Sequence, residues 1–336
     1  MAAITAATVA QIVHRYVLPY ISNNWFKGSP LVNRLWSEKK SVDGAARISA
    51  ICSTTTAGRA TSWDGGITGL TISNRLPVRE AYYVWKYYQT YVAYEMQEQV
   101  RLSGSATAIK NWAQEKGRME ADGFLDRIAT DLFGDGTDAD GTEDSGITGI
   151  AAMCDDGDPG ATHYYGSLAV ATYDWWVGLD VGKGSSDYGG DGTSWVPTRD
   201  KLDKIILAAA YSPKDRVNLV VCDKASYRAL KECFYTDGYV NYPNPTKPDL
   251  GFESFTIEGG IEVMWDNYCS ANTIYGLNTK HCWLAVHPDF QMQLKPRQSM
   301  EPAGYPGAEV AFMKLACNLI CDSRNRMFRI TDVATS

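Results

Sequence analysis

The chain has 336 residues, of which 45% are hydrophobic and 21% are charged, and its formal net charge is -7. A disordered chain would have fewer aromatic residues and more charge, so this one is expected to fold, as one large domain or two to three smaller ones. The acidic balance, without a basic stripe, excludes a protein that grips DNA through its phosphates. Any DNA nearby would be contained and not read.

The N-terminal segment MAAITAATVAQIVHRYVLPY has no basic flank before its apolar residues and no run long enough to span a bilayer. We therefore expect neither a signal peptide nor a membrane anchor, and we expect folding in a cytoplasm. The segment predicts a short amphipathic helix. The apolar anchors that follow are interrupted by Pro19 and Pro30 and are too widely spaced to bury one another: Trp25, Phe26, Leu31, Leu35 and Trp36. This arm must dock on another surface, or else it is a strap across its own domain.

Residues 44–84 predict a long two-stranded hairpin. Strand-like flanks enclose a middle that is rich in Gly, Thr and Ser, including Gly65 and Gly66, which indicates a mobile tip. Two strands alone bury too little apolar area to be stable in water. The hairpin is therefore expected to need a partner surface, either in its own chain or in a neighbour.

Residues 105–133 carry the strongest helical signal. Ser105 can act as N-cap, Gly134 follows the end, and one buried face repeats at the four-three spacing through Ala121, Leu125, Ile128 and Leu132. At 1.5 Å per residue this helix would be about 40 Å long. Gly117 and Gly123 allow a bend or a close crossing. The acidic loop of residues 134–146 fails the EF-hand template, so a solvated turn is favoured over a calcium site.

Helices and strands alternate after residue 164. TRDKLDKIILAAAYS predicts a helix with an inward face made of Leu202, Ile205, Ile206 and Ala209. VNLVVCD predicts a buried strand, and KASYRALKECF predicts a second helix. FESFTIEGGIEVMWDNY predicts a tight hairpin that turns at Gly259 and Gly260. With the further strands downstream, the fold class is mixed α+β.

The search for chemistry is mostly negative, since the sequence has no phosphate-binding loop, dinucleotide fingerprint, H-E-x-x-H or G-x-S-x-G motif. His281 and His287 lie six apart on one face of a strand-like run, but no third metal ligand is signalled, so structural roles are favoured. The eight cysteines lack C-x-x-C spacing, which favours buried free thiols over disulfides or metal sites. Trp175 and Trp176 could line a glycan cleft, although such aromatics also anchor protein interfaces.

The ordered set of segments resembles a known family. Residues 85–136, from WKYYQTYVAYE to RIATDLFGDG, resemble the long spine helix and its lead-in of tailed-bacteriophage major capsid proteins with the Hong Kong ninety-seven capsid fold. GITGIAAMCDD and YYGSLAVATYDWWVG resemble the passage into the axial domain, and RVNLVVCDKASYRALKE resembles a strand and helix of that domain. No single motif is specific, but their order matches the family over nearly the whole chain.

The resemblance implies an α+β capsid fold with five parts: an N-terminal arm (1–43), an extended β-hairpin loop (44–84), a peripheral domain with the spine helix (85–155), an axial domain (156–275) and returning strands of the peripheral domain (276–336). It implies a structural virion protein and not an enzyme, with no catalytic, cofactor or metal site. Its copies would assemble as pentamers and hexamers into an icosahedral head around double-stranded DNA. A scaffolding protein and a portal are the implied partners, in the host cytoplasm and without a membrane.

Two departures from the family are informative. The arm starts near Met1 without a removable scaffolding region, which implies a separate scaffolding protein or none. There is no lysine between Lys40 and Lys86, so an isopeptide weld from the extended loop is not expected and the shell should be noncovalent. The expected inter-subunit contact residues are Trp25, Trp36, Arg47, Arg59, Trp63, Arg75 and Arg79, because the arginines suit bidentate contacts to a neighbour's carboxylates. The alternatives are an encapsulin-like nanocompartment shell and, from a different class, a glycan-active protein.

Overall fold

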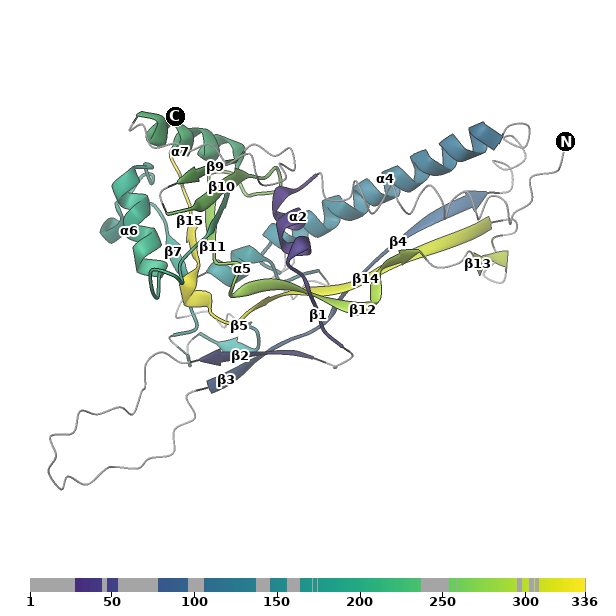
Figure 1. Cartoon of the computed structure of the whole chain (residues 1–336), viewed down its shortest axis with the longest axis horizontal. Coiled ribbons are helices and arrows are strands. Elements are labelled where there is room, and N and C mark those ends of the chain that lie inside the picture. Colours follow the sequence, from purple (N-terminus) through teal and green to yellow (C-terminus); the bar gives the residue numbers. More distant parts are fainter. Residues whose placement is uncertain are drawn as a thin grey trace, which may run out of the picture.

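The computed structural model describes most of the chain outside the N-terminus and the longest loops (Figure 1). The described residues are 28–43, 47–53, 78–95, 106–136, 146–155, 164–170, 172–173, 175–236, 254–257, 259–294, 298–301, 305 and 308–335. The predicted N-terminal helix, the tip of the hairpin and most of the acidic loop lie outside them.

The described helices and strands form a mixed α+β fold, as predicted. The helices are α2 (Pro30–Ser37), α4 (Ala106–Phe133), α5 (Ile150–Cys154), α6 (Arg199–Ala209) and α7 (Lys224–Thr236), with short 3-10 turns η1 (Ser186–Tyr188) and η3 (Arg324–Arg326). The strands are β1 (Lys40–Ser41), β2 (Ile48–Ser53), β3 (Val78–Tyr83), β4 (Lys86–Glu95), β5 (Tyr164–Tyr165), β6 (Leu168–Ala169), β7 (Leu179–Val181), β8 (Leu219–Cys222), β9 (Ser254–Ile257), β10 (Ile261–Trp265), β11 (Ile274–Leu277), β12 (Cys282–Leu294), β13 (Gln298–Ser299), β14 (Ala308–Cys321) and β15 (Phe328–Ile330).

A six-stranded sheet in the order β7-β15-β11-β8-β10-β9 forms the first lobe together with α6 and α7 (Figure 1). The predicted inward face of α6 is confirmed, because all four of its residues are buried: Leu202, Ile205, Ile206 and Ala209. Gly259 and Gly260 both have positive φ and turn β9 back onto β10, which confirms the predicted tight hairpin. We call this part the helical lobe.

Strand β8 lies between two hydrophobic cores, and this position explains why its sequence does not alternate apolar and polar residues. Val220 and Cys222 face the hydrophobic core shared with α6 and α7, while Leu219 and Val221 join a second core on the opposite side of the sheet. A strand buried on both faces must be apolar at every position, because successive side chains point to opposite faces. The continuous run that predicted a buried strand is therefore the signature of a sheet covered on both sides.

The second lobe is elongated and contains the longest strands. The order β1-β12-β14-β13 runs through it, with β4 on the other edge of β14, and α4 lies along the sheet (Figure 1). The helix occupies the predicted range, and its predicted face is buried where it meets β4: Ala121, Leu125, Ile128 and Leu132. A Cβ atom at Gly123 would meet no described atom within 4 Å, so the close crossing considered at this glycine is absent there.

The described part of the N-terminal arm is a strap across its own chain. Leu31 and Leu35 of α2 are buried in the main core, and β1 pairs in parallel with β12. Ser29 caps α2 and donates a hydrogen bond to the buried Asp266, which also accepts one from the Leu31 amide. Of the two alternatives for the arm, the strap across its own domain therefore holds for the described residues, because α2 is amphipathic and packs on β12.

Two further sequence expectations concern buried groups. All eight cysteines are free thiols, and all except the half-buried Cys233 are buried, which confirms the prediction of buried free thiols. Burial raises the pKa of Cys52 and of Cys154 to about 12, so these thiols stay protonated. Trp176 is completely buried and donates from its indole nitrogen to the Tyr165 carbonyl, so it does not line an open cleft.

In its C-terminal half, the chain passes between the two lobes twice. The first crossing follows β11 and leads into β12, and the second follows β14 and leads through η3 into β15. Although residues 276–336 were expected to belong to the peripheral part, β15 pairs with β11 and β7 in the helical lobe. Phe328 and Ile330 are fully buried there, and this apolar burial stabilises β15 in the helical lobe.

Candidate functional site

The base of the predicted hairpin is a regular antiparallel pair in the described part of the chain. Residues of β2 and β3 pair from Ile48 opposite Tyr83 to Ser53 opposite Val78. One face of the pair is buried against the chain's own core, where the Tyr83 hydroxyl donates a hydrogen bond to the Cys321 carbonyl at 2.7 Å. The predicted need for a partner surface is therefore met on this face by the same chain.

The other face of the hairpin base is open. Ile51 and Tyr82 are exposed there, and the exposure of apolar side chains continues along the same chain path through Val84 into β4. We call Ile51, Tyr82, Val84, Tyr87 and Tyr91 the apolar strip; the exposed fractions of Ile51 and Tyr87 are 68% and 70%. Single exposed apolar residues are ordinary, but five along the β2–β3 pair and the strand that follows it can supply an interaction surface.

Charged groups flank the apolar strip at the hairpin. Glu80 accepts a hydrogen bond from the Tyr82 hydroxyl at 2.7 Å, which raises the pKa of this phenol, and the nearby Arg47 charge opposes the rise. Arg79 is exposed, and its guanidinium carbon lies 5.7 Å from the centre of the Tyr173 ring. Arg47 thus lies near the exposed Tyr82, which can combine ion pairing with apolar burial, whereas Arg79 pairs with Cys52 on the inner face of the hairpin, next to the half-buried Tyr173.

The other predicted contact residues divide into two groups. Trp36 is half-buried against the main core, and the Lys39 ammonium lies 3.9 Å from the centre of its ring. Trp36 therefore packs within its own chain, and only the exposed part of its side chain is available to another molecule. The remaining four lie outside the described residues: Trp25, Arg59, Trp63 and Arg75.

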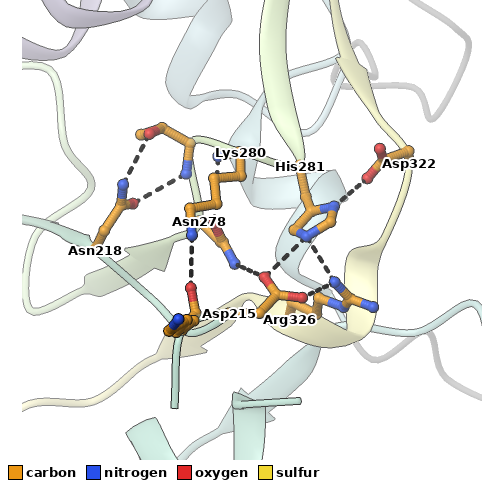
Figure 2. A network of polar contacts seen from close by, with 9 residues as sticks. Asp215, Asn218, Asn278, Lys280, His281, Asp322 and Arg326 are labelled. Atoms are coloured by element: carbon orange, nitrogen blue, oxygen red, sulfur yellow. Dashed lines mark hydrogen bonds and ion pairs between the residues drawn. The ribbon is translucent and has the colours of Figure 1, made fainter. Parts of the chain in front are cut away.

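A second polar site lies where the chain crosses between the lobes, and the sequence alone did not predict it (Figure 2). His281 precedes β12 and contacts carboxylates on both sides of its ring: Nδ1 lies 2.7 Å from Asp322 Oδ1, and Nε2 lies 2.9 Å from Asp215 Oδ1. Arg326 of η3 places Nη1 2.6 Å from the same Nε2 and also pairs with Asp215. We call His281, Asp215, Asp322 and Arg326 the junction cluster.

The loop that carries Asp215 is anchored to the first crossing by amides. Asn278 donates to Asp215 Oδ1 at 2.9 Å, and Asn218 donates from its side-chain amide to Thr279 and accepts from the Thr279 backbone (Figure 2). Burial raises the pKa of Asp215, but the hydrogen bonds from Asn278 and His281 with the charges of His281 and Arg326 outweigh it, and the net shift is downward. For His281, burial lowers the pKa, but the hydrogen bond and charge of Asp322 outweigh it and the net shift is upward.

The two histidines singled out in the sequence have separate surroundings. His287 packs against Trp85 and Phe290, with ring centres 5.4 Å away in each case. Among the described residues there is no group of three or more His, Cys, Asp or Glu side chains that could hold a metal ion. Within that same part of the chain, no helix has the length and apolar character needed to cross a membrane.

Comparisons with known proteins place this fold. No protein-family model and no curated protein sequence matches the chain. Among solved structures, the chain is similar to a chain of the cyanophage A-1(L) capsid asymmetric unit, with a TM-score of 0.65, 15% identity and coverage of 90% of this chain and 92% of that one. It has a phage capsid fold.

Two other shell proteins share the fold. The capsid of a native GTA particle aligns with a TM-score of 0.55 and 14% identity over 89% of this chain and 90% of that one. The SrpI encapsulin of Synechococcus elongatus aligns with a TM-score of 0.54 and 11% identity over 90% and 88%. At these identities the likeness establishes the fold alone, over about nine-tenths of this chain.

Proposed function

We propose that this chain is the major capsid protein of a tailed bacteriophage, of the Hong Kong ninety-seven type, which assembles as pentamers and hexamers into an icosahedral head around double-stranded DNA. The observation that carries the proposal is the capsid fold, matched over nine-tenths of the chain by a cyanophage capsid protein. The apolar strip, with Arg47 near it, adds a surface that a neighbouring copy could cover. The proposed role is structural and non-enzymatic, in the virion, after assembly in the host cytoplasm.

In the proposed shell, the helical lobe is the axial domain and gathers around fivefold and quasi-sixfold axes. The elongated lobe with α4 is the peripheral domain and meets neighbours near threefold positions. The hairpin of residues 44–84 lies across an adjacent subunit, with Arg47 and Arg79 pairing with carboxylates of that subunit. The open outer face of β2 and β3 supports this arrangement, since the inner face is already covered by its own chain. Closed symmetry would multiply such weak contacts into a stable shell.

Charge supports the proposal that packaged DNA is contained without sequence-specific binding. A chain with a formal net charge of -7 does not supply the cationic surface that phosphate contacts require. Guidance during assembly is proposed to come from a scaffolding protein and a portal. An encapsulin-like compartment is the second candidate, because the SrpI encapsulin has the same fold and similar coverage.

Electron microscopy of the protein, expressed alone and with the phage's other head genes, tests the proposal. We expect closed particles, and with the other head genes we expect angular heads filled with DNA. Small closed shells that never hold DNA and enclose a protein cargo would favour the encapsulin candidate. A protein that stays monomeric at every concentration, with or without the other head proteins, would contradict both.

A further inference from the structure

The junction cluster joins segments that are distant in the sequence and that belong to both crossings. Asp215 comes from the loop between α6 and β8 in the helical lobe, and His281 immediately precedes β12 at the first crossing. Asp322 immediately follows β14, and Arg326 lies in η3, at the second crossing. A single imidazole ring therefore touches the helical lobe and both of these C-terminal crossings to and from the elongated lobe (Figure 2).

The ring nitrogen Nε2 has two partners that make opposite demands. To donate a hydrogen bond to Asp215 Oδ1, Nε2 must carry a proton; to accept one from Arg326 Nη1, it must present its lone pair. Both neighbours lie within hydrogen-bonding distance, so protonation of the ring selects between them. On the other side of the ring, Nδ1 can donate to Asp322 in either state.

The balance of charges in the junction cluster also depends on whether the His281 ring is protonated. With a protonated ring, two carboxylates face one imidazolium and one guanidinium, so the charges balance. With a neutral ring, Asp215 and Asp322 share the charge of Arg326 alone. Lys280, the other charged side chain at this turn, points its ammonium at the Lys214 carbonyl and not at the ring. All four members of the cluster are less than a third exposed, so solvent screens these charges only in part.

We propose that His281 is a proton-operated latch, which fixes the two crossings between the lobes when its ring is protonated and loosens them when the ring is neutral. In the protonated state the ring bridges Asp215 of the helical lobe and Asp322 of the second crossing. In the neutral state the bridge to Asp215 is lost and Nε2 accepts from Arg326. If the chain builds a shell as proposed above, the latch acts where the relative orientation of the two lobes is decided.

The way in which the stability of the junction cluster changes with pH follows from the pKa shifts of His281 and Asp215. Because the pKa of His281 is raised in the fold, its contribution to stability is complete below the pKa of an unfolded histidine and is lost as pH rises through the folded value. Because the pKa of Asp215 is lowered, its contribution is present above the pKa of an unfolded Asp and is lost as pH falls through the folded value. The latch is thus closed below the ordinary pKa of histidine and opens as pH rises through the raised value.

Deuterium exchange of the whole protein, read by mass spectrometry, tests the latch in single chains and in assemblies alike. Exchange of each imidazole C2 hydrogen as a function of pH gives the pKa of each histidine, and we expect that of His281 to lie above its ordinary value and to fall in Asp322→Asn. After correction for intrinsic rates, backbone amides of residues 277–282 and 321–328 should exchange about tenfold faster at about pH 8.5 than at about pH 6.

Two variants make the test specific. His281→Gln cannot be protonated, so the pH dependence of exchange at both crossings should disappear, while His287→Gln, which alters a histidine packed on Trp85, should keep it. A His281 pKa at or below the ordinary value, or an unchanged pH dependence of exchange in His281→Gln, would overturn the latch. Neither result would bear on shell formation, which microscopy decides separately.

Discussion

At the scale of single residues, Arg324 shows how one buried charge can organise a junction. Its side chain is buried and donates to four backbone carbonyls, those of Ala152, Met153, Asp155 and Trp176, at 2.7 to 2.9 Å. Three of these belong to α5 or the residue that follows it, so the guanidinium caps the end of this helix. A planar group with five donors is required to reach all four oxygens, which a lysine cannot do.

We expect Arg324→Met to destabilise the fold by about 3 kcal/mol or more, because four buried carbonyls lose their donor. Arg324→Lys should recover only a minority of this loss. Chemical denaturation of the purified protein measures both. The control is Arg228→Met, since Arg228 pairs with Glu232 on the exposed surface of α7 and should contribute less than about 1 kcal/mol. Equal losses in Arg324→Met and Arg228→Met would show that the capping role is wrong.

At the scale of elements, the sequence predicted those helices, strands and turns that depend on a pattern within one short segment. The buried face of α4 follows from the spacing of residues such as Leu125 and Ile128, and the β9-β10 turn follows from two adjacent glycines. The all-apolar run of β8 predicted a buried strand, and all four residues of β8 are buried. Each of these features depends on residues within one short segment, so the sequence carries the whole signal.

Pairings between distant segments could not be predicted in the same way. The parallel pairing of β1 with β12 and the return of β15 to the helical lobe depend on which surfaces remain uncovered after the rest has packed. The junction cluster has the same cause, since Asp215, His281 and Asp322 come together only through long-range topology. A lone histidine in the sequence gives no sign of such neighbours. The hairpin was foreseen as a projecting element, but the division into a buried and an open face required the pairing with the core.

The open face of the hairpin makes a prediction at the element scale. Ile51 is exposed on β2, so Ile51→Asp should leave the stability of the single chain nearly unchanged and yet impair assembly, because a buried unpaired carboxylate would be costly at an interface. Ile51→Val retains an apolar side chain and should assemble normally. Sedimentation of particles, together with thermal unfolding of the unassembled chain, separates the two effects.

A deletion of residues 54–68 extends this test. The strands β2 and β3 would remain with the rest of the fold, so we expect folded subunits that fail to form stable closed particles. Normal particles from the deletion, or from Ile51→Asp, would mean that the hairpin contributes nothing essential to the shell.

At the scale of the whole molecule, the two lobes and the hairpin form one body in which hydrophobic packing is continuous. The main core contains residues of both sheets, such as Leu277 and Leu315, and of the hairpin, such as Ala81. A body of this kind offers several separate surfaces to its neighbours while remaining a single folded unit. That combination suits a shell, in which each copy must contact several others without unfolding.

We predict that such a shell is held together without covalent links between its copies. The chain has no lysine between Lys40 and Lys86, so the hairpin cannot supply the amine of an isopeptide bond. All eight cysteines are free thiols, and seven of them are buried. Purified particles boiled in detergent should therefore run as a single band near 37.0 kDa, with or without a reducing agent. A ladder of multimers would show that covalent links exist.

The most direct test of shell formation is a cryo-electron microscopy map of assembled particles at a resolution that traces side chains. We expect pentamers and hexamers of this chain in a closed shell, with the outer face of β2 and β3, including Ile51 and Tyr82, covered by a neighbouring copy. Particles in which that face remains open to solvent would contradict the proposed role of the hairpin. Failure of the chain to form any closed shell, together with the other head proteins, would contradict the capsid function itself.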